Sequence, residues 1–232
     1  MKKLLLVGLF VFRAVATVSA ETYSTSLFNS ASQGDAEAQF KLGLCFFSGS
    51  GIEKSWAQAA KWVEKAAGQG HVNAQLLLGD FYSWGLGGGG TYSTAQAARW
   101  YRAAAEQGSA DAQFRLGTCY VGAQSYVEAA KWFRKAAIQG HVVAQCELGR
   151  GYAAGQGVPQ SWVEAVRWWR LAAEKGDSDA QFLLGCCYMN GRGVEQSYDR
   201  GKKWWRRSAA QGNKDAESSL KGLIYLFETE GL

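Results

Sequence analysis

Cysteine and histidine are the side chains of this sequence with the widest chemical use, because they bind metals, form disulfides and act as nucleophiles. The chain has five cysteines and two histidines. Each histidine, His71 and His141, follows a glycine, and neither has a Cys, His or Asp at the spacing of metal ligands. We therefore interpret both as turn residues and predict neither a metal site nor a cofactor.

The cysteines show no pattern of pairing. Cys45, Cys119 and Cys187 occupy the same position of a repeated segment, in copies two repeats apart. That separation exceeds the roughly 7 Å between Cα atoms that a disulfide can span. Cys186 is adjacent to Cys187 on one helix and faces a different direction, and Cys146 lies at a different level of its helix from Cys119. Because the number of cysteines is odd, at least one of them has no partner for a disulfide within the chain. We expect most of them to be buried thiols that act as small apolar side chains.

Motifs of common enzymes are missing. The sequence contains no G-x-S-x-G, no H-E-x-x-H and no isolated carboxylate pair. The glycine run at 87–90 follows no strand and precedes no Lys-Ser/Thr, so it predicts a flexible insertion rather than a phosphate-binding loop. The sequence thus predicts a protein that is not an enzyme.

Tryptophans could stack on sugar rings, and the chain has ten of them. Five stand seven residues after a serine: Trp62, Trp100, Trp132, Trp168 and Trp204. An aromatic side chain at one fixed helical position in every copy is more typical of the core between repeats. We interpret these five as structural, and glycan binding by a Trp-rich surface stays an alternative.

The elements that position these residues come from a segment that occurs five times. Each copy opens with Ala-Gln, has Leu-Gly four residues after the Ala, and has an aromatic residue soon after. The copies begin at residues 38, 74, 112, 144 and 180, and a degraded copy begins at 216. Such a period predicts an all-α solenoid (an α/α superhelix) of about five tandem helix-turn-helix repeats. The predicted domains are an N-terminal capping half-repeat (21–37), the repeats 38–73, 74–111, 112–143, 144–179 and 180–215, and a C-terminal cap (216–232).

Each repeat is predicted to contain two helices. The first carries a central glycine, which costs up to about 1 kcal/mol relative to alanine and so indicates close helix approach. These glycines are Gly43, Gly79, Gly117, Gly149 and Gly185. The second helix begins at a serine that has Gln or Glu three residues later in four copies, which predicts a capping box. It ends at a glycine suited to a left-handed conformation.

Residues 1–20 differ from the repeats. Lys2 and Lys3 precede an apolar run, and Val18-Ser19-Ala20 resembles a signal-peptidase site, so we expect a signal peptide cleaved after Ala20. The run is too short to span a bilayer, and no transmembrane segment is expected after its removal. The chain has 25 basic and 20 acidic residues, and without the three basic residues of this segment the net charge falls from +5 to +2. Nucleic acid is therefore not an expected partner.

These residues resemble the Sel-one-like repeat family, a relative of the tetratricopeptide repeats. The fourth copy matches the family pattern almost throughout, from Ala144, Leu148 and Gly149 to Trp168 and Gly176. The resemblance implies a right-handed superhelix and an adaptor function, often at bacterial envelopes or in the eukaryotic secretory pathway. A cysteine-rich branch of the family is linked to β-lactam binding, but it needs paired cysteines, which this chain lacks.

One stripe of the first helices is expected to line a concave groove that holds a peptide or a helix of another protein. The predicted partner-binding residues are Phe40, Leu76, Asp80, Trp84, Phe114, Arg150 and Phe182. The alternative is that neighbouring repeats bury these aromatic side chains. We therefore predict a monomeric, exported scaffold that is secreted or periplasmic, or lies in the endoplasmic reticulum lumen of a eukaryote. Glycan or peptidoglycan binding is the second hypothesis, and a hydrolase-like protein of the cysteine-rich type is a disfavoured third.

Overall fold

The computed structural model describes residues 22–86 and 92–230, in which the chain forms twelve α-helices and no strand. The prediction of an all-α repeat fold is confirmed. The helices belong to two compact units, and the boundary between them in the sequence lies between Ser109 and Ala110. The predicted signal peptide and the glycine run at 87–90 lie outside the described residues.

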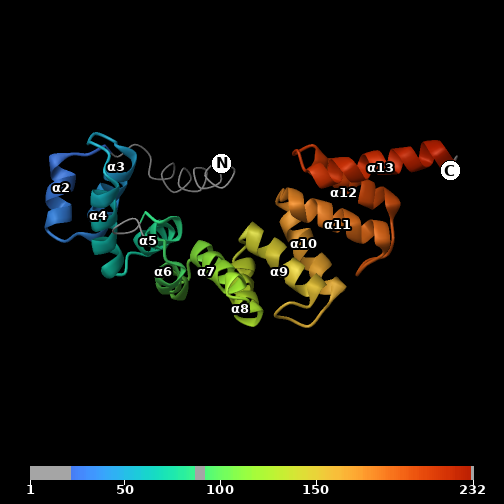
Figure 1. Cartoon of the computed structure of the whole chain (residues 1–232), viewed down its shortest axis with the longest axis horizontal. Helices are drawn as coiled ribbons and strands as arrows, with labels where there is room; N and C mark the ends of the chain where they lie inside the picture. Colours follow the sequence, from blue (N-terminus) through green and yellow to red (C-terminus); the bar gives the residue numbers. More distant parts are fainter. Residues whose placement is uncertain (1–21, 87–91, 231–232) are drawn as a thin grey trace. The chain divides into compact units, whose positions relative to one another are not determined.

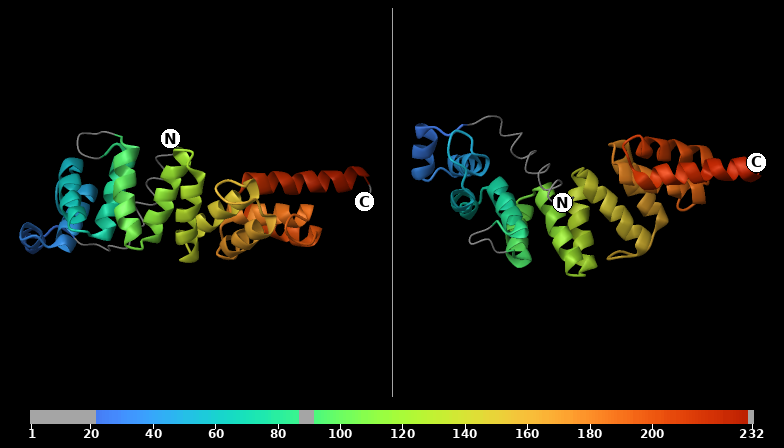
Figure 2. Two further views of the ribbon diagram at one scale, coloured as in Figure 1. Left: turned by 90° about the horizontal axis from the view of Figure 1, so that it is seen from below. Right: turned by 45° about the horizontal axis from the view of Figure 1, so that its top comes forward.

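Consecutive helices pack against each other within each unit (Figure 1). The first unit contains α2 (Thr25–Ser32), α3 (Ala36–Ser48), α4 (Trp56–Gly68), α5 (Val72–Trp84) and α6 (Thr94–Glu106). The second unit contains α7 (Ala110–Gly122), α8 (Tyr126–Ile138), α9 (Val142–Ala154), α10 (Trp162–Glu174), α11 (Ser178–Asn190), α12 (Tyr198–Ala209) and α13 (Lys214–Glu230). The degraded sixth copy forms α13, drawn in red in Figure 2 as one straight helix next to α12.

The repeated serines cap the second helices, with one exception. The hydroxyls of Ser55, Ser93, Ser161 and Ser197 accept a hydrogen bond from the backbone N–H three residues later. Ser125 follows the shortened loop of the third copy and makes no such side-chain bond. In a capping box the Gln or Glu side chain three residues later would also accept the backbone N–H of the serine, and this second bond is replaced here. Each serine N–H donates instead to the carbonyl of an aromatic residue in the preceding helix, as from Ser161 to Tyr152 (2.9 Å).

The central glycines let the two helices of a repeat approach closely. A Cβ on Gly43 would lie 2.7 Å from Cγ2 of Val63, and one on Gly149 would lie 2.5 Å from Nε1 of Trp169. In every copy the contacting residue is the one that follows the repeated tryptophan. Those residues are Val63, Tyr101, Phe133, Trp169 and Trp205. The repeated tryptophans themselves divide into two kinds: Trp62 and Trp168 are buried, whereas Trp100, Trp132 and Trp204 are half-buried.

The glutamine of each Ala-Gln pair is buried and joins neighbouring helices, a role that sequence reasoning missed. Gln181 shows the arrangement: its Nε2 donates to the carbonyl of Ala173 (3.1 Å), and its Oε1 accepts from Nε2 of Gln211 (2.9 Å). The same paired bonds occur at Gln39 and Gln75. The recurrence of glutamine beside a buried alanine was the available sequence signal.

The fourth copy departs from this arrangement. Lys175 stands where the other copies have Gln69, Gln107, Gln139 and Gln211. Its Nζ donates to the carbonyl of Gly140 (2.9 Å), and Oε1 of Gln145 is a buried acceptor with no hydrogen-bond partner in the described structure.

Replacing Lys175 by glutamine is therefore expected to stabilise the protein. The new Nε2 donor can reach Oε1 of Gln145, and satisfying a buried acceptor contributes about 1 kcal/mol. Urea unfolding of Lys175→Gln, compared with Lys175→Ala, measures the gain. Equal stability of the two variants would contradict the prediction that the new amide bonds to Oε1 of Gln145, because only glutamine supplies the missing donor.

Candidate functional site

Two of the predicted groove residues are buried. Phe40 is 4% exposed and Asp80 is 6% exposed. The Phe40 ring lies against the imidazole of His71, with 4.7 Å between ring centroids, and Asp80 Oδ1 accepts a 2.6 Å hydrogen bond from the Tyr101 hydroxyl. Neither side chain is available to a partner protein.

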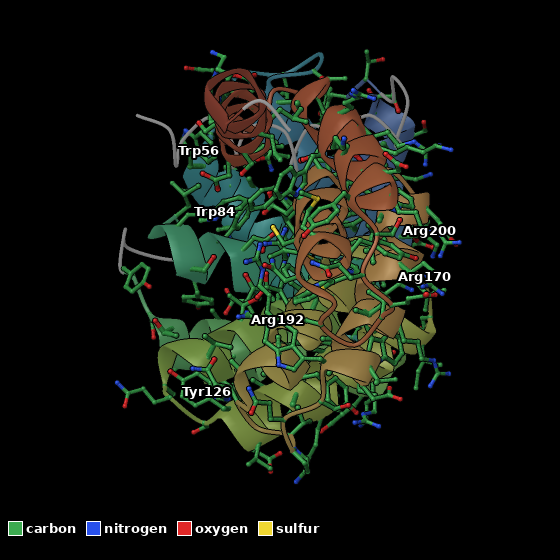
Figure 3. All side chains as sticks on the ribbon, turned by 90° about the vertical axis from the view of Figure 1, so that its right-hand side faces the viewer. Trp56, Trp84, Tyr126, Arg170, Arg192 and Arg200 are labelled. Atoms are coloured by element: carbon green, nitrogen blue, oxygen red, sulfur yellow. The ribbon has the colours of Figure 1, made fainter. Side chains whose placement is uncertain are left out.

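The other predicted residues reach the surface in different degrees. Leu76 and Trp84 are half-buried in the first unit, where Figure 3 labels Trp84. Phe114 and Phe182 are half-buried in the second unit, and the Phe114 ring stacks on His141 at 4.7 Å between centroids. Arg150 is exposed. Its guanidinium pairs with the carboxylates of Glu147 (3.4 Å) and Asp179 (3.1 Å).

Both histidines are helix caps rather than plain turn residues. Nδ1 of His71 accepts the N–H of Ala74 (3.1 Å), and Nδ1 of His141 does the same for Ala144. In this orientation Nε2 of His71 lies 2.8 Å from Oε2 of Glu37, which belongs to α3, the first helix of the preceding repeat. Among the described residues, no three His, Cys, Asp or Glu side chains are grouped as metal ligands.

A pocket of about 370 Å³ lies in the second unit between α9, α10 and α11. The two tryptophans of α10, Trp162 and Trp169, form much of its apolar wall, and Leu183 of α11 adds to it. The remaining lining residues are Arg150, Ala153, Ala154, Cys186, Cys187, Asn190 and Arg192. Of the predicted groove residues, only Arg150 lines this pocket.

The two arginines of the pocket differ in their charge environment. Arg150 is paired with two carboxylates, as described above. Arg192, labelled in Figure 3, has its guanidinium carbon 5.0 Å from the centre of the Trp162 ring. The ion pairs formed by the described residues do not include Arg192. The pocket therefore combines an apolar wall with one cation that pairs with no carboxylate of the described residues.

The thiols in and beside the pocket are poor nucleophiles. All five cysteines carry thiols rather than disulfides, and Cys45, Cys146 and Cys187 are buried. Burial, together with the charge of Asp177, raises the pKa of the Cys146 thiol to about 12. Burial and the neighbouring Cys186 raise the pKa of Cys187 to about 12 as well. A nucleophilic cysteine needs the opposite shift, toward the thiolate at neutral pH.

Alkaline pH is expected to destabilise the protein through these thiols. In the unfolded chain a cysteine ionises near pH 8.5, whereas Cys146 and Cys187 stay protonated in the folded state up to about pH 12. The unfolded state loses its protons first, so the stability falls between these two values, by at most about 1.4 kcal/mol per pH unit for each thiol. Urea unfolding from pH 7 to 10.5 measures the fall, which is shallower for a Cys146→Ala/Cys187→Ala variant. Parallel curves for the two proteins would contradict the prediction.

Paired helices that repeat at this spacing, with a small residue at each crossing, define the class of α-helical repeat proteins. The chain belongs to the Sel1 repeat family, whose pattern matches residues 36–71, 72–109, 110–141, 142–177 and 178–213. The resemblance seen in the sequence is thereby confirmed. Sel1 repeats mediate protein–protein interactions.

Solved structures support this assignment. A Sel1 repeat protein from Oxalobacter formigenes is 36% identical, with a TM-score of 0.74, over 82% of this chain and 77% of that one. The protein c5321, a protective antigen present in uropathogenic Escherichia coli strains, is 30% identical with a TM-score of 0.55, over 90% of this chain and 52% of its own length. A MamA protein is 17% identical with a TM-score of 0.51, over 82% of this chain and 96% of the MamA chain. This likeness shows the fold alone. Comparison with curated proteins gives no match.

Proposed function

We propose that this protein is a non-enzymatic scaffold, exported from the cell that makes it, which binds another protein through the second unit. The observation that carries the proposal is the pocket between α9, α10 and α11. Its wall is apolar, its thiols are held protonated by burial, and its one charge without an ion pair among the described residues belongs to Arg192. Such a surface favours binding over bond-making chemistry.

The glycan alternative has less support from the tryptophans, because cations lie over several of the indole rings. Lys54 lies 4.6 Å from the centre of the Trp56 ring, and Lys135 lies 3.9 Å from that of Trp132. Arg207 is placed similarly over Trp204 (4.8 Å). A sugar stacking on those faces would first have to displace the cation.

Export is proposed from the sequence of residues 1–20. No helix among the described residues is long and apolar enough to cross a membrane. N-terminal sequencing of protein from the extracytoplasmic fraction is expected to begin at Glu21. A chain that keeps Met1 and stays in the cytoplasm would contradict export and leave the binding proposal intact.

Site-specific photo-crosslinking tests the scaffold function in the organism that produces the protein. A benzophenone amino acid at Asn190, on the pocket rim, is expected to crosslink to a discrete protein that mass spectrometry identifies. The control is the same amino acid at Tyr92, an exposed residue of the first unit (70%). Absence of a crosslink at Asn190, or the same proteins at both positions, would contradict binding through the second unit.

A further inference from the structure

The first and fourth repeats share a tryptophan at the start of the second helix, directly after the capping serine. These residues are Trp56 and Trp162, and the other three repeats have Thr94, Tyr126 and Tyr198 there. In the first repeat Phe47 fills the space beside this tryptophan. Its ring meets Trp56 edge-on at 4.7 Å between centroids and stacks on Phe81 at 5.6 Å.

The fourth repeat lacks both phenylalanines. Ala153 takes the place of Phe47, because each stands nine residues after the opening Ala of its repeat. Cys187 takes the place of Phe81, because each stands seven residues after the opening Ala of the following repeat. Ala153 and Cys187 line the pocket together with Trp162. The pocket therefore corresponds in sequence position to the place that a phenyl ring of the chain itself fills in the first repeat. Trp169, in the position of Val63, forms a wall of this pocket, with its ring centre 6.5 Å from that of Trp162.

The positive charge of Arg192 beside this pocket limits the chemical class of ligand that fits it. Arg192 lies against Trp162, at the rim of the pocket, and forms no ion pair with the described residues. A ligand that matches the pocket has an aromatic ring and an anion only a few bonds apart. The last residue of a polypeptide, when it is aromatic, carries both, because its side chain and its α-carboxylate share one Cα. An internal Asp or Glu would need a second residue to supply the ring.

We propose that the pocket binds the C-terminal residue of a partner protein. Its aromatic side chain occupies the position that Phe47 takes in the first repeat, and its free carboxylate pairs with the guanidinium of Arg192. This inference rests on the proposed scaffold function and specifies the chemistry of the partner.

A display library tests the choice of ligand. Random heptapeptides are fused so that their carboxylates are free, and they are selected on the chain from residue 21 and on its Ala153→Phe variant. Ala153→Phe places in the pocket the residue that the first repeat has there. Peptides that end in Phe, Tyr or Trp are expected to be enriched on the unmodified protein and not on the variant. Thermal unfolding shows whether the variant is folded.

A second measurement tests the carboxylate without altering the core. The most enriched peptide is made as the free acid and as the C-terminal amide, and its binding is followed by fluorescence polarisation. The amide is expected to bind about tenfold more weakly to the unmodified protein, which is the effect of losing one charge-assisted contact. Arg192→Gln is expected to bind acid and amide alike. Lys54→Gln, which removes the cation on Trp56 of the first unit, is expected to keep the tenfold difference.

Each other outcome has a defined meaning. Equal binding of acid and amide to the unmodified protein, or a tenfold difference that survives Arg192→Gln, overturns the proposal. Enrichment of an internal motif also overturns it while supporting the scaffold function. An empty selection combined with a crosslink at Asn190 overturns the C-terminal ligand alone. An empty selection without any crosslink overturns both the ligand and the scaffold function.

Discussion

Alanine in place of Gly157 is expected to destabilise the second unit by about 3 kcal/mol or more. Gly157 lies between α9 and α10 with φ +74°, in the left-handed region, where a Cβ costs about 1–2 kcal/mol. A Cβ at this position would also overlap the backbone carbonyl of Tyr126, at the start of α8. Because that contact is with backbone rather than with a flexible side chain, the loop must separate from α8, which adds the cost of an overpacked contact.

Gly176→Ala is the matched control for this prediction. Gly176 also has a positive φ, +96°, but nothing lies within 4 Å of its Cβ position. Its replacement therefore measures the backbone strain alone, about 1–2 kcal/mol. Urea unfolding followed by circular dichroism compares the two variants. Equal losses of stability in the two variants would contradict the prediction, because they would show that the contact between this loop and α8 adds nothing to the cost.

Gly149→Ala is the second substitution for which we expect a large effect, a loss of about 2–3 kcal/mol from overpacking. The new methyl group would lie 2.5 Å from Nε1 and 2.6 Å from Cδ1 of Trp169. That indole is 3% exposed and donates a 3.1 Å hydrogen bond to the carbonyl of Cys146, so it cannot turn away without losing the bond. Since Trp169 also lines the pocket, binding of the C-terminal peptide should weaken as well.

A double-mutant cycle with Trp169→Ala identifies the cause. Trp169→Ala alone is expected to cost about 3–5 kcal/mol, as a large-to-small change in a core. The double variant should lose clearly less than the sum of the two single losses, because the methyl group then occupies part of the space that the ring leaves. Gly222→Ala is the control for glycine inside a helix: Gly222 lies within α13, nothing lies within 4 Å of its Cβ position, and stability should rise by about 0.5–1 kcal/mol. Additive losses in the cycle would contradict the direct contact.

The second helix of each repeat and its ends were predictable because one residue decides each end. The first helices begin two residues before the Ala-Gln pair, at Ala36, Val72, Ala110, Val142 and Ser178. A serine hydroxyl caps a helix and a glycine ends it through bonds that span three or four residues, which a sequence shows directly. The shortened third copy marks where such local reasoning ends. Ser125 is in register with the other serines but does not cap its helix, because the loop before it holds it at a different backbone conformation (φ −89°, ψ 64°).

The candidate site was less predictable, because burial there depends on residues from the next repeat. Phe40 fits an exposed stripe on α3, but the His71 ring from the N-terminus of α5 lies against it. Asp80 fits the same stripe and is held inside by the Tyr101 hydroxyl. The pocket arises from residues that are small where another copy has large ones, Ala153 and Cys187. A search for conspicuous side chains overlooks such positions, whereas aligning the copies with one another would have shown them.

The buried glutamines have a consequence for how chains of this kind change in length. Gln75 donates to the carbonyl of Ala67, near the end of α4, and accepts from Gln107, after α6. Each glutamine thus needs only an alanine carbonyl supplied by the copy before it and an amide supplied by its own copy. Duplication or loss of a copy that has both glutamines therefore creates a junction with the same two bonds as those at Gln39, Gln75 and Gln181. A copy that has lysine in place of the second glutamine, as at Lys175, lacks one of these bonds. An array built in this way can be lengthened or shortened by recombination without the design of a new interface.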